Sequence, residues 1–232
     1  MHSTFTFKGT ASSTHGILIE HIAPIQRGEE RVSNIIIPGR PGDLTIVEGE
    51  DIYNPYIQTV VISVPGNKVS TVRAWLRGSG WLTFSNDSSR RQQALVINAV
   101  TLEKVPHSIN WYRGDVEFYC QPIKRPLTDA SASVTSGGNV TNAGDLVMYP
   151  LITLAGSGDM TVTILQNTLS IDDVPNGGCI IDTEAHMVTN GAGTESLNAQ
   201  VSGSWPVLPV GTYALTYTGA TGCTFTNRER YL

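Results

Sequence analysis

Polar and apolar residues alternate most strictly in one short stretch near the middle of this chain. Residues 115–120 read Asp-Val-Glu-Phe-Tyr-Cys. Because successive side chains of a strand point to opposite faces, the alternation predicts a strand with one solvated and one buried face. Pro122 and Pro126 follow, and we expect them to end the strand because proline cannot donate a ladder hydrogen bond. The composition changes there, which predicts two domains, residues 1–126 and 127–232.

The pattern in the first domain predicts short strands around a single helix. Polar residues 26–34 are expected to form an exposed loop, and Pro38-Gly-Arg-Pro-Gly-Asp43 a tight turn between two strands. The helix is expected over residues 67–78, since Asn67 is a suitable N-cap, Gly78 a suitable terminator, and apolar residues recur at helical spacing between them. The expected strands are 5–7, 17–22, 35–37, 44–46, 56–64, 81–84 and 94–105, the last apolar on both faces and therefore central in its sheet.

The second domain has almost no helical signal. Short apolar runs, such as 151–155 and 160–165, recur roughly every ten residues. They are separated by turns rich in glycine and asparagine, such as 156–158, which is typical of a β-sandwich. The predicted fold class is therefore mainly β, with an N-terminal β-sandwich-like domain that contains one α-helix and a C-terminal β-sandwich.

Charge divides the chain in the same place. Residues 1–126 contain 13 Lys+Arg and 11 Asp+Glu, whereas residues 127–232 contain 2 and 9, so the balances are near +2 and −7. Such asymmetry usually marks surfaces that face different partners, and two unrelated solvated faces are the alternative.

Two further features restrict the setting in which the protein assembles. No run of about 18 apolar residues predicts a membrane span, and the first residues alternate instead of forming the apolar core of a signal peptide. The three cysteines are odd in number and far apart, so we expect small buried residues in a protein assembled under reducing conditions. They are Cys120, Cys179 and Cys223.

Candidate chemistry is sparse. Asp182, Glu184 and His186 are spaced to share one face of an expected strand and could bind a divalent cation, although a solvated outer face is the favoured interpretation. Asp172 and Asp173 fit a turn better than a glycosidase carboxylate pair. The chain has no G-x-S-x-G, no H-E-x-x-H and no phosphate-binding glycine loop. We therefore expect no enzyme, no cofactor and no metal.

Binding residues have two candidate groups. Trp205 could stack on a sugar as an exposed aromatic of a lectin-like sandwich, or could close the end of the sandwich core. Four arginines could form a nucleic-acid patch, but the domain is barely basic and lacks interleaved exposed aromatics, so contact between subunits or with solvent is expected instead. They are Arg73, Arg77, Arg90 and Arg91.

Six stretches in this order together resemble one known family: 38–44, 72–88, 115–122, 150–158, 180–184 and 203–211. In them the sequence is similar to the distal tail (Dit) proteins of bacteriophages with long non-contractile tails and of their prophage relatives. The similarity covers nearly the whole chain, although each motif is loose. Ile123 departs from the pattern, which has an aromatic residue after the proline.

The resemblance implies a structural, non-catalytic protein of the virion. Such proteins form a homohexameric ring at the distal end of the tail, assembled in the cytoplasm of the host bacterium. Their N-terminal domains make the ring between the tail tube protein and a tail-tip protein or fibre. Their galectin-like C-terminal sandwiches point outward, where receptor-binding proteins can attach. Neither sequence-specific nucleic-acid binding nor a membrane is implied, and a carbohydrate-binding module for host recognition is the alternative function.

Overall fold

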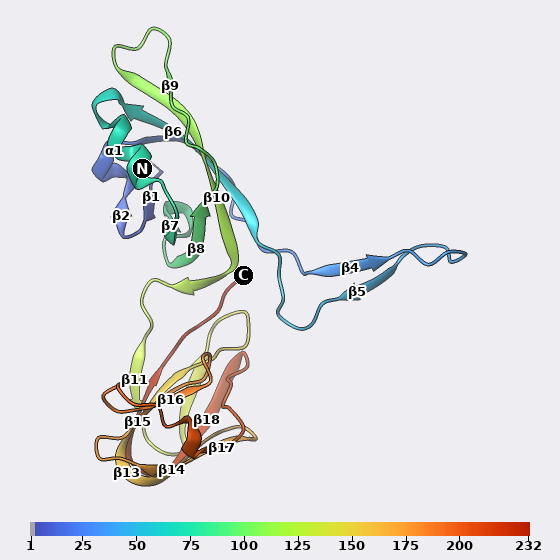
Figure 1. Cartoon of the computed structure of the whole chain (residues 1–232), viewed down its shortest axis with the longest axis vertical. Coiled ribbons are helices and arrows are strands. Elements are labelled where there is room, and N and C mark those ends of the chain that lie inside the picture. Colours follow the sequence, from blue (N-terminus) through green and yellow to red (C-terminus); the bar gives the residue numbers. More distant parts are fainter. Residues whose placement is uncertain (1–2) are drawn as a thin grey trace. The chain divides into compact units, whose positions relative to one another are not determined.

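The computed structural model describes residues 3–232, which divide into two compact units (Figure 1). Unit 1 ends at Leu127, and unit 2 is Thr128–Tyr231. Both are built from antiparallel strands, and α1 (Val69–Trp75) is the one α-helix among the described residues. The predicted mainly β fold class is confirmed. Within residues 3–232, no helix has the length and apolar character that a membrane crossing requires.

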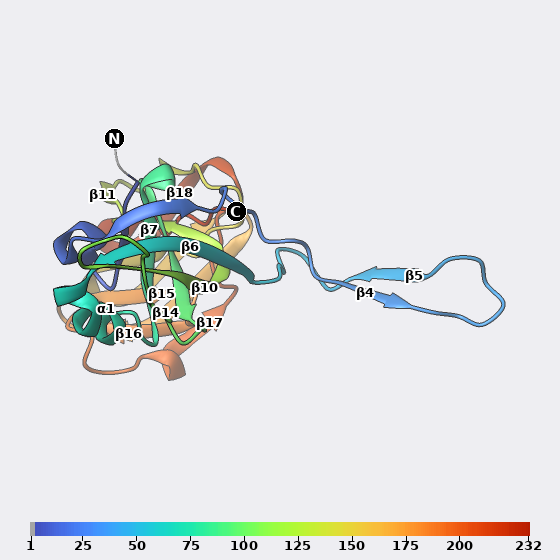
Figure 2. The same cartoon turned by 90° about the horizontal axis from the view of Figure 1, so that it is seen from above.

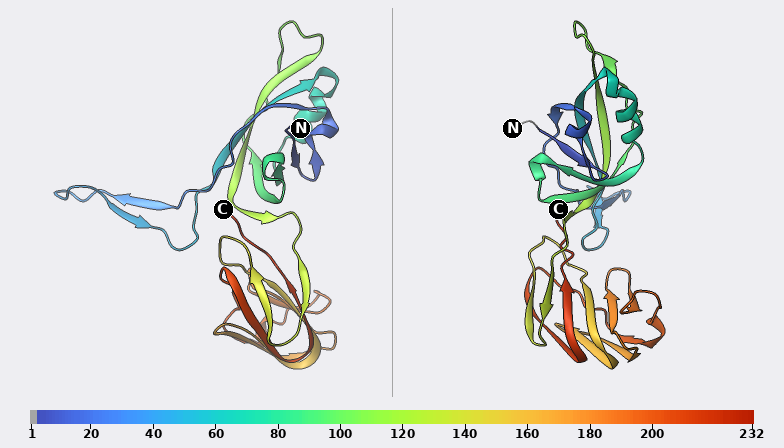
Figure 3. Two further views of the ribbon diagram at one scale, coloured as in Figure 1. Left: turned by 180° about the vertical axis from the view of Figure 1, so that it is seen from behind. Right: turned by 90° about the vertical axis from the view of Figure 1, so that its left-hand side faces the viewer.

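Unit 1 is a curled eight-stranded sheet with α1 packed on it (Figure 3). Its strand order is β2-β1-β7-β8-β10-β6-β3, and β9 pairs with Tyr112 and Arg113 at the start of β10. The bounds are β1 Phe5–Phe7, β2 Thr10–Ala11, β3 Leu18–Ile22, β6 Tyr56–Pro65, β7 Ser79–Phe84, β8 Arg90–Val96, β9 Glu103–Lys104 and β10 Trp111–Pro126. Short 3-10 turns lie at Ser12–His15, Gly66–Lys68 and Ser85–Asp87.

Aromatic rings fill the centre of unit 1. The ring of Phe118, on the buried face of β10, lies 5.5 Å from the rings of both Phe5 and Phe7 and 6.2 Å from that of Phe84. Trp75 at the end of α1 stacks on Phe5 at 5.6 Å, and its indole N–H donates to the carbonyl of Phe7. The alternation that predicts a buried face for 115–120 therefore places Phe118 where the strands and the helix converge.

The predicted end of the central strand is confirmed at Pro126, but Pro122 does not end it. β10 continues through Pro122 to Pro126, and its pairing with β8 shifts register between Cys120 and Lys124. A proline is tolerated at such an irregularity because the ladder is already interrupted there and needs no N–H from that residue.

Three other expectations for unit 1 need correction. The strand expected at 35–37 spans Val32–Ile35, so it begins inside the stretch 26–34 that is expected to be a loop. The helix is shorter than predicted, since a 3-10 turn occupies 66–68 and α1 ends at Trp75. Asn67 is not the N-cap, because Lys68 occupies that position without a side-chain capping bond. The stretch 94–105 is not one central strand: β8 ends at Val96, and residues 97–102 cross irregularly to β9.

Unit 2 is a sheet folded over on itself, with its core between the two layers. Two long strands, β13 (Leu151–Ile164) and β18 (Gly211–Thr226), pair along most of their length, and their register shifts on both sides of Gly156. Gly156 and Gly219 have φ of 133° and 75°, conformations that glycine adopts most readily, so both strands can bend there and enter the second layer. The sequence predicts two strands where β13 is one, because the Gly-Ser-Gly run at 156–158 resembles a turn.

The remaining strands complete the two layers. β12, β14 and β17 extend one end of the long pair, and β11, β15 and β16 extend the other. Their bounds are β11 Ser131–Val134, β12 Gly138–Asn142, β14 Asn167–Val174, β15 Cys179–Asp182, β16 Met187–Asn190 and β17 Val201–Gly203, with a 3-10 turn at Asn198–Gln200. The buried core between the layers is mostly aliphatic and also includes Phe225 and two cysteines.

A separate two-stranded sheet projects from unit 1. β4 (Val32–Ile35) pairs with β5 (Leu44–Val47), and Figure 2 shows this hairpin extending away from the strands of unit 1. Residues 29–54, which include the hairpin and its base, are called the arm below.

Candidate assembly surfaces

The arm consists of two ladders separated by a bulge. The outer ladder is β4–β5, and an inner one is made by hydrogen bonds between the Arg31 N–H and the Ile52 carbonyl and between the Asn54 N–H and the Glu29 carbonyl. Residues 49–51 have no partner in the ladder and form the bulge, with φ of 87° at Gly49 and 58° at Asp51. The arm is therefore paired at its base and along its outer hairpin, and the bulge between the two ladders allows it to bend.

Apolar side chains lie on both faces of the outer hairpin. Directly opposed residues of an antiparallel pair share a face, so Val32 and Val47 lie on one face and Ile35 and Leu44 on the other. Ile46 is 43% exposed, and Ile36 beyond the end of β4 is 79% exposed. An isolated two-stranded hairpin is marginally stable in water, so a hairpin that exposes apolar side chains on both faces is stabilised by contact with another surface.

The outward face of unit 1 has an exposed apolar row. Tyr119 of β10 is paired with Ile57 on one side and Leu95 on the other, and Ile97 follows Leu95 on the same face. Ile57 is 48% exposed, although Gln58 and Val60 on the opposite face of the strand are buried. We call Ile57, Leu95, Ile97 and Tyr119 the apolar row. The arm and this row both present exposed apolar side chains on unit 1.

The four predicted interface arginines lie on two elements. Arg73 is on the exposed side of α1 and Arg77 follows the helix, whereas Arg90 and Arg91 begin β8. The guanidinium of Arg91 lies 4.5 Å from the ring centre of Trp81, which is a cation–π contact within the unit. Their contact with another subunit remains a prediction.

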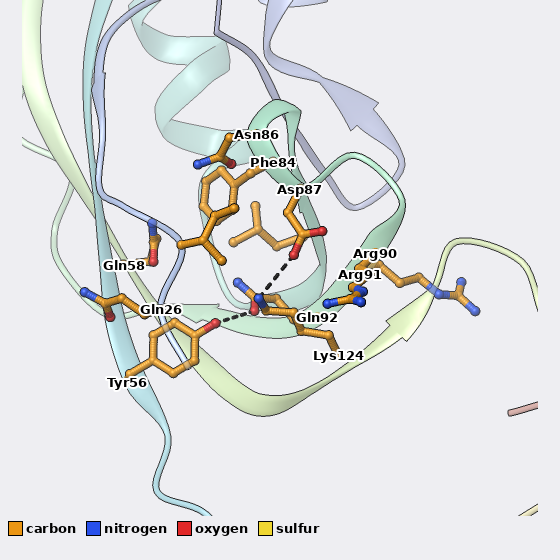
Figure 4. A pocket seen from close by; sticks show the side chains of 12 residues that line it. Gln26, Tyr56, Gln58, Phe84, Asn86, Asp87, Arg90, Arg91, Gln92 and Lys124 are labelled. Atoms are coloured by element: carbon orange, nitrogen blue, oxygen red, sulfur yellow. Dashed lines mark hydrogen bonds and ion pairs between the residues drawn. The ribbon is translucent and has the colours of Figure 1, made fainter. Parts of the chain in front are cut away.

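A small polar cavity lies near the base of the arm (Figure 4). Lys124 reaches across it to Asp87, with 3.1 Å between Nζ and Oδ2, and Tyr56 donates to Gln92 at 2.7 Å. Burial raises the pKa of the Tyr56 phenol above its ordinary value, with a smaller contribution from nearby Cys120. The cavity volume is about 20 Å³, so it has room for about one water molecule rather than a substrate. The ion pair fixes β10 to the turn before β8, and the Tyr56 hydrogen bond joins β6 to β8.

Trp205 lies at one end of unit 2 and is half-buried. Its indole packs against the core of the sandwich, and the imidazole of His186 stacks on it, with 5.0 Å between ring centres and 23° between planes. His186 therefore covers part of the ring that a sugar would need. The role of Trp205 as a glycan contact is not tested by the structure and stays a prediction.

Asp182, Glu184 and His186 do not share a strand face as expected. β15 ends at Asp182, and the next residues form a turn because the Asp182 carboxylate accepts the N–H groups of Glu184 and Ala185, each at 3.1 Å. Arg228 pairs with the same carboxylate at 2.8 Å. Among residues 3–232, no three His, Cys, Asp or Glu side chains gather as metal ligands. This cluster holds the C-terminal segment against the sandwich.

The Asp182 cluster makes the stability of unit 2 depend on pH. Burial opposes ionisation of Asp182, but the bonds from Arg228 and the two N–H groups outweigh it and hold the pKa of the carboxyl below its ordinary value. A group whose folded-state pKa is lowered stabilises the fold above its unfolded-state pKa, and this stabilisation is lost as pH falls through the folded-state pKa. Asp182→Asn is therefore expected to cost about 1–3 kcal/mol near pH 7 and to have little effect in acid.

Denaturant unfolding of unit 2 at a series of pH values measures this difference. Asp172→Asn, an exposed substitution on β14, is the matched control and should change stability little at any pH. A difference between wild type and Asp182→Asn that stays constant down to pH 2 would contradict the prediction.

The three cysteines are buried and free. Burial raises the pKa of Cys120 to about 12 and those of Cys179 and Cys223 to about 11. Thiols held this far from ionisation are poor nucleophiles, so they act as small apolar residues of the cores. Asp172 and Asp173 are exposed, but they lie in β14 (Asn167–Val174) and not in a turn, so the sequence prediction for them is wrong.

Comparison with known proteins finds no match by sequence and a match by structure. No protein-family model matches the sequence, and no curated protein matches it. The structure is similar to the crystal structure of SPP1 Dit (gp 19.1), with a TM-score of 0.80 over 100% of both chains and 17% sequence identity. This chain has the Dit fold. The predicted resemblance is thereby confirmed at the level of fold. SPP1 Dit is described as a paradigm of the hub adsorption apparatus in phages that infect Gram-positive bacteria.

The apolar runs of the arm are visible in the sequence, but their pattern alone does not show that they are exposed. The runs at 32–37 and 44–47 flank a double Pro-Gly turn, and their apolar residues occupy both faces of the hairpin instead of one. Such a run usually indicates a buried strand. Here the strands are exposed, so the apolar runs form a candidate contact surface.

Proposed function

We propose that this chain is a structural, non-catalytic hub protein of a bacteriophage tail, which self-associates into a ring through unit 1. The observation that carries the proposal is a projecting arm with apolar side chains on both faces, on a chain with the Dit fold. A surface of this kind is stabilised by burial against another molecule. A second copy is the simplest partner, because the same chain presents the exposed apolar row.

A ring follows from the asymmetry of these surfaces. The arm and the apolar row are different patches, so contact between them is heterologous. A heterologous contact closes into a ring when the rotation that relates one subunit to the next is a full turn divided by a whole number. The homohexamer of the Dit proteins is the proposed stoichiometry. Arg73, Arg77, Arg90 and Arg91 are proposed as further contacts on the same unit.

The two units are proposed to serve different partners within the virion. Unit 1, near neutral, would contact neighbouring copies, the tail tube protein and the tail-tip protein at the distal end of the tail. Unit 2 has a formal charge near −7 from 9 acidic and 2 basic residues, and its two arginines, Arg228 and Arg230, contact the unit itself. It would face outward, toward receptor-binding proteins or fibres.

The proposal is tested by measuring the mass of the purified protein over a range of concentrations, with negative-stain imaging of the product. The expected result is a discrete oligomer that appears as a closed ring. A protein that stays monomeric at every concentration would refute the self-association on which the proposal depends.

A further inference from the structure

The arm leaves unit 1 at a point where two stretches of backbone touch. Residues 53–55 lead directly from the arm into β6, and Gly28 precedes the opposite strand of the arm. A methyl group at Gly28 would lie 2.5 Å from Cβ of Pro122, 3.1 Å from the carbonyl oxygen of Asn54 and 3.2 Å from Cβ of Tyr53. Carbon atoms pack at about 3.5–4.0 Å, so the base of the arm fits against β10 only because residue 28 has no side chain.

Pro122 occupies an interruption in the sheet that the base of the arm covers. Pairing of β10 with β6 ends at Cys120 and Tyr56, and pairing with β8 shifts between Cys120 and Lys124. Pro122 has no N–H to offer a neighbouring strand, yet it is buried. The contact at Gly28 is therefore with a rigid ring in a fixed strand rather than with a side chain that can rotate away.

The chain before Gly28 is anchored separately. The amide of Gln58, which is 3% exposed, donates to the carbonyl oxygens of Ala23 at 2.8 Å and Pro24 at 3.3 Å. Residues 23–24 are held on β6 and the inner ladder holds residue 29 to residue 54, so displacement at residue 28 is expected to turn the arm. The φ of Gly28 is outside the left-handed region, so the position needs space and not an unusual backbone conformation.

We propose that Gly28 is a positioning residue for the arm: its close contact with Pro122 sets the direction in which the arm leaves unit 1. The direction is a property of the single chain. Its consequence, that the arm of one copy meets the correct surface of the next, rests on the self-association proposed above.

The direction can be measured as a distance within one chain. Spin labels at Arg40→Cys, at the tip of the arm, and Lys104→Cys, on β9, occupy exposed positions, and all three native cysteines are buried. Labelled protein is diluted into unlabelled protein so that only distances within a chain are recorded. Gly28→Ala is expected to shift the distance distribution, and an unchanged distribution would overturn the proposal.

A matched control and a rescue variant identify the contact responsible. Gly222→Ala makes the same chemical change where the nearest atom, Cβ of Ala155, is 4.0 Å away, and should leave the distribution unchanged. Pro122→Gly removes the closest atom that the new methyl group meets and leaves the milder contacts with Tyr53 and Asn54, so the double variant Gly28→Ala/Pro122→Gly is expected to return the distance most of the way to the wild-type value. A shift that persists in the double variant would overturn the assigned contact.

Assembly supplies the second readout. Gly28→Ala is expected to weaken self-association at least about tenfold, and Pro122→Gly to recover it. If the wild-type chain does not self-associate, the proposed function fails while the distance measurement still decides the role of Gly28. If the wild type associates and Gly28→Ala associates equally well with an unchanged distance, the positioning role is refuted and the proposed function stands.

Discussion

A carboxylate on either face of the arm is expected to prevent self-association while both units stay folded. Ile35→Asp changes one face of the outer hairpin and Val47→Asp the other. Burying an aliphatic side chain contributes about 1.5–3 kcal/mol, and the new charge has to be desolvated as well, so association should weaken about 100-fold or more. Sedimentation over a range of concentrations measures the change, and circular dichroism verifies the fold.

Val210→Asp provides the control for the arm variants. Val210 is 52% exposed in unit 2, so the same chemical change is made on an apolar side chain outside the arm. It should leave association unchanged. If Ile35→Asp and Val47→Asp associate as the wild type does, the arm is not the assembly surface, and the observation that carries the proposed function loses its meaning.

Truncating Phe118 is expected to destabilise unit 1 by about 3–5 kcal/mol and to leave unit 2 unaffected. Its ring contacts Phe5, Phe7 and Phe84, so the cavity left by alanine lies at the point where the aromatic cluster of the unit meets. Hydrogen exchange followed by mass spectrometry resolves the two units, and loss of protection should be confined to residues up to Leu127.

Phe225→Ala is the matched variant in unit 2. Phe225 is 3% exposed in β18 and packs against the core between the two layers. Its loss is expected to lower protection only in residues 128–231, the reverse of the first variant. Loss of protection in both units with either substitution would show that they unfold as one cooperative body, and the division of the chain into two domains would be wrong.

The sequence predicts the elements whose faces differ strongly in polarity. Residues 115–120 have one face in an aromatic core and one in solvent, so period-two alternation is unambiguous and β10 is found. The short strands of unit 2 are found for the same reason. Where a glycine permits a bend without a break, as at Gly156, the same local signal cannot distinguish a turn from a strand that continues into another layer.

Other features depend on contacts that no local pattern contains. Residues 97–102 are as apolar as a strand, but side-chain bonds from Asn98 to the backbone of Asp115 and Glu117 replace the regular ladder there. The tight approach of Gly28 to Pro122 joins residues that are far apart in sequence. Glycine at position 28 is surrounded by charged residues and is indistinguishable in sequence from a loop glycine.

The turn at Asp182 shows why the strand face expected to be shared by Asp182, Glu184 and His186 is wrong. Spacing at i, i+2 and i+4 implies one face only if the strand continues. The carboxylate of Asp182 instead accepts backbone N–H groups from the next residues, and these bonds close the turn. Aspartate is a common metal ligand, but it also ends strands by accepting hydrogen bonds from nearby backbone N–H groups. The carboxylate of Asp182 has such partners without an ion.

The two long strands of unit 2 have a mechanical consequence. Because β13 and β18 each pass through both layers, the layers cannot slide or separate without breaking bonds along two continuous chains. A load applied at one end of the sandwich is transmitted to the other through covalent backbone. Unit 2 is thus expected to resist deformation and to transmit a force from one end of the sandwich to the other.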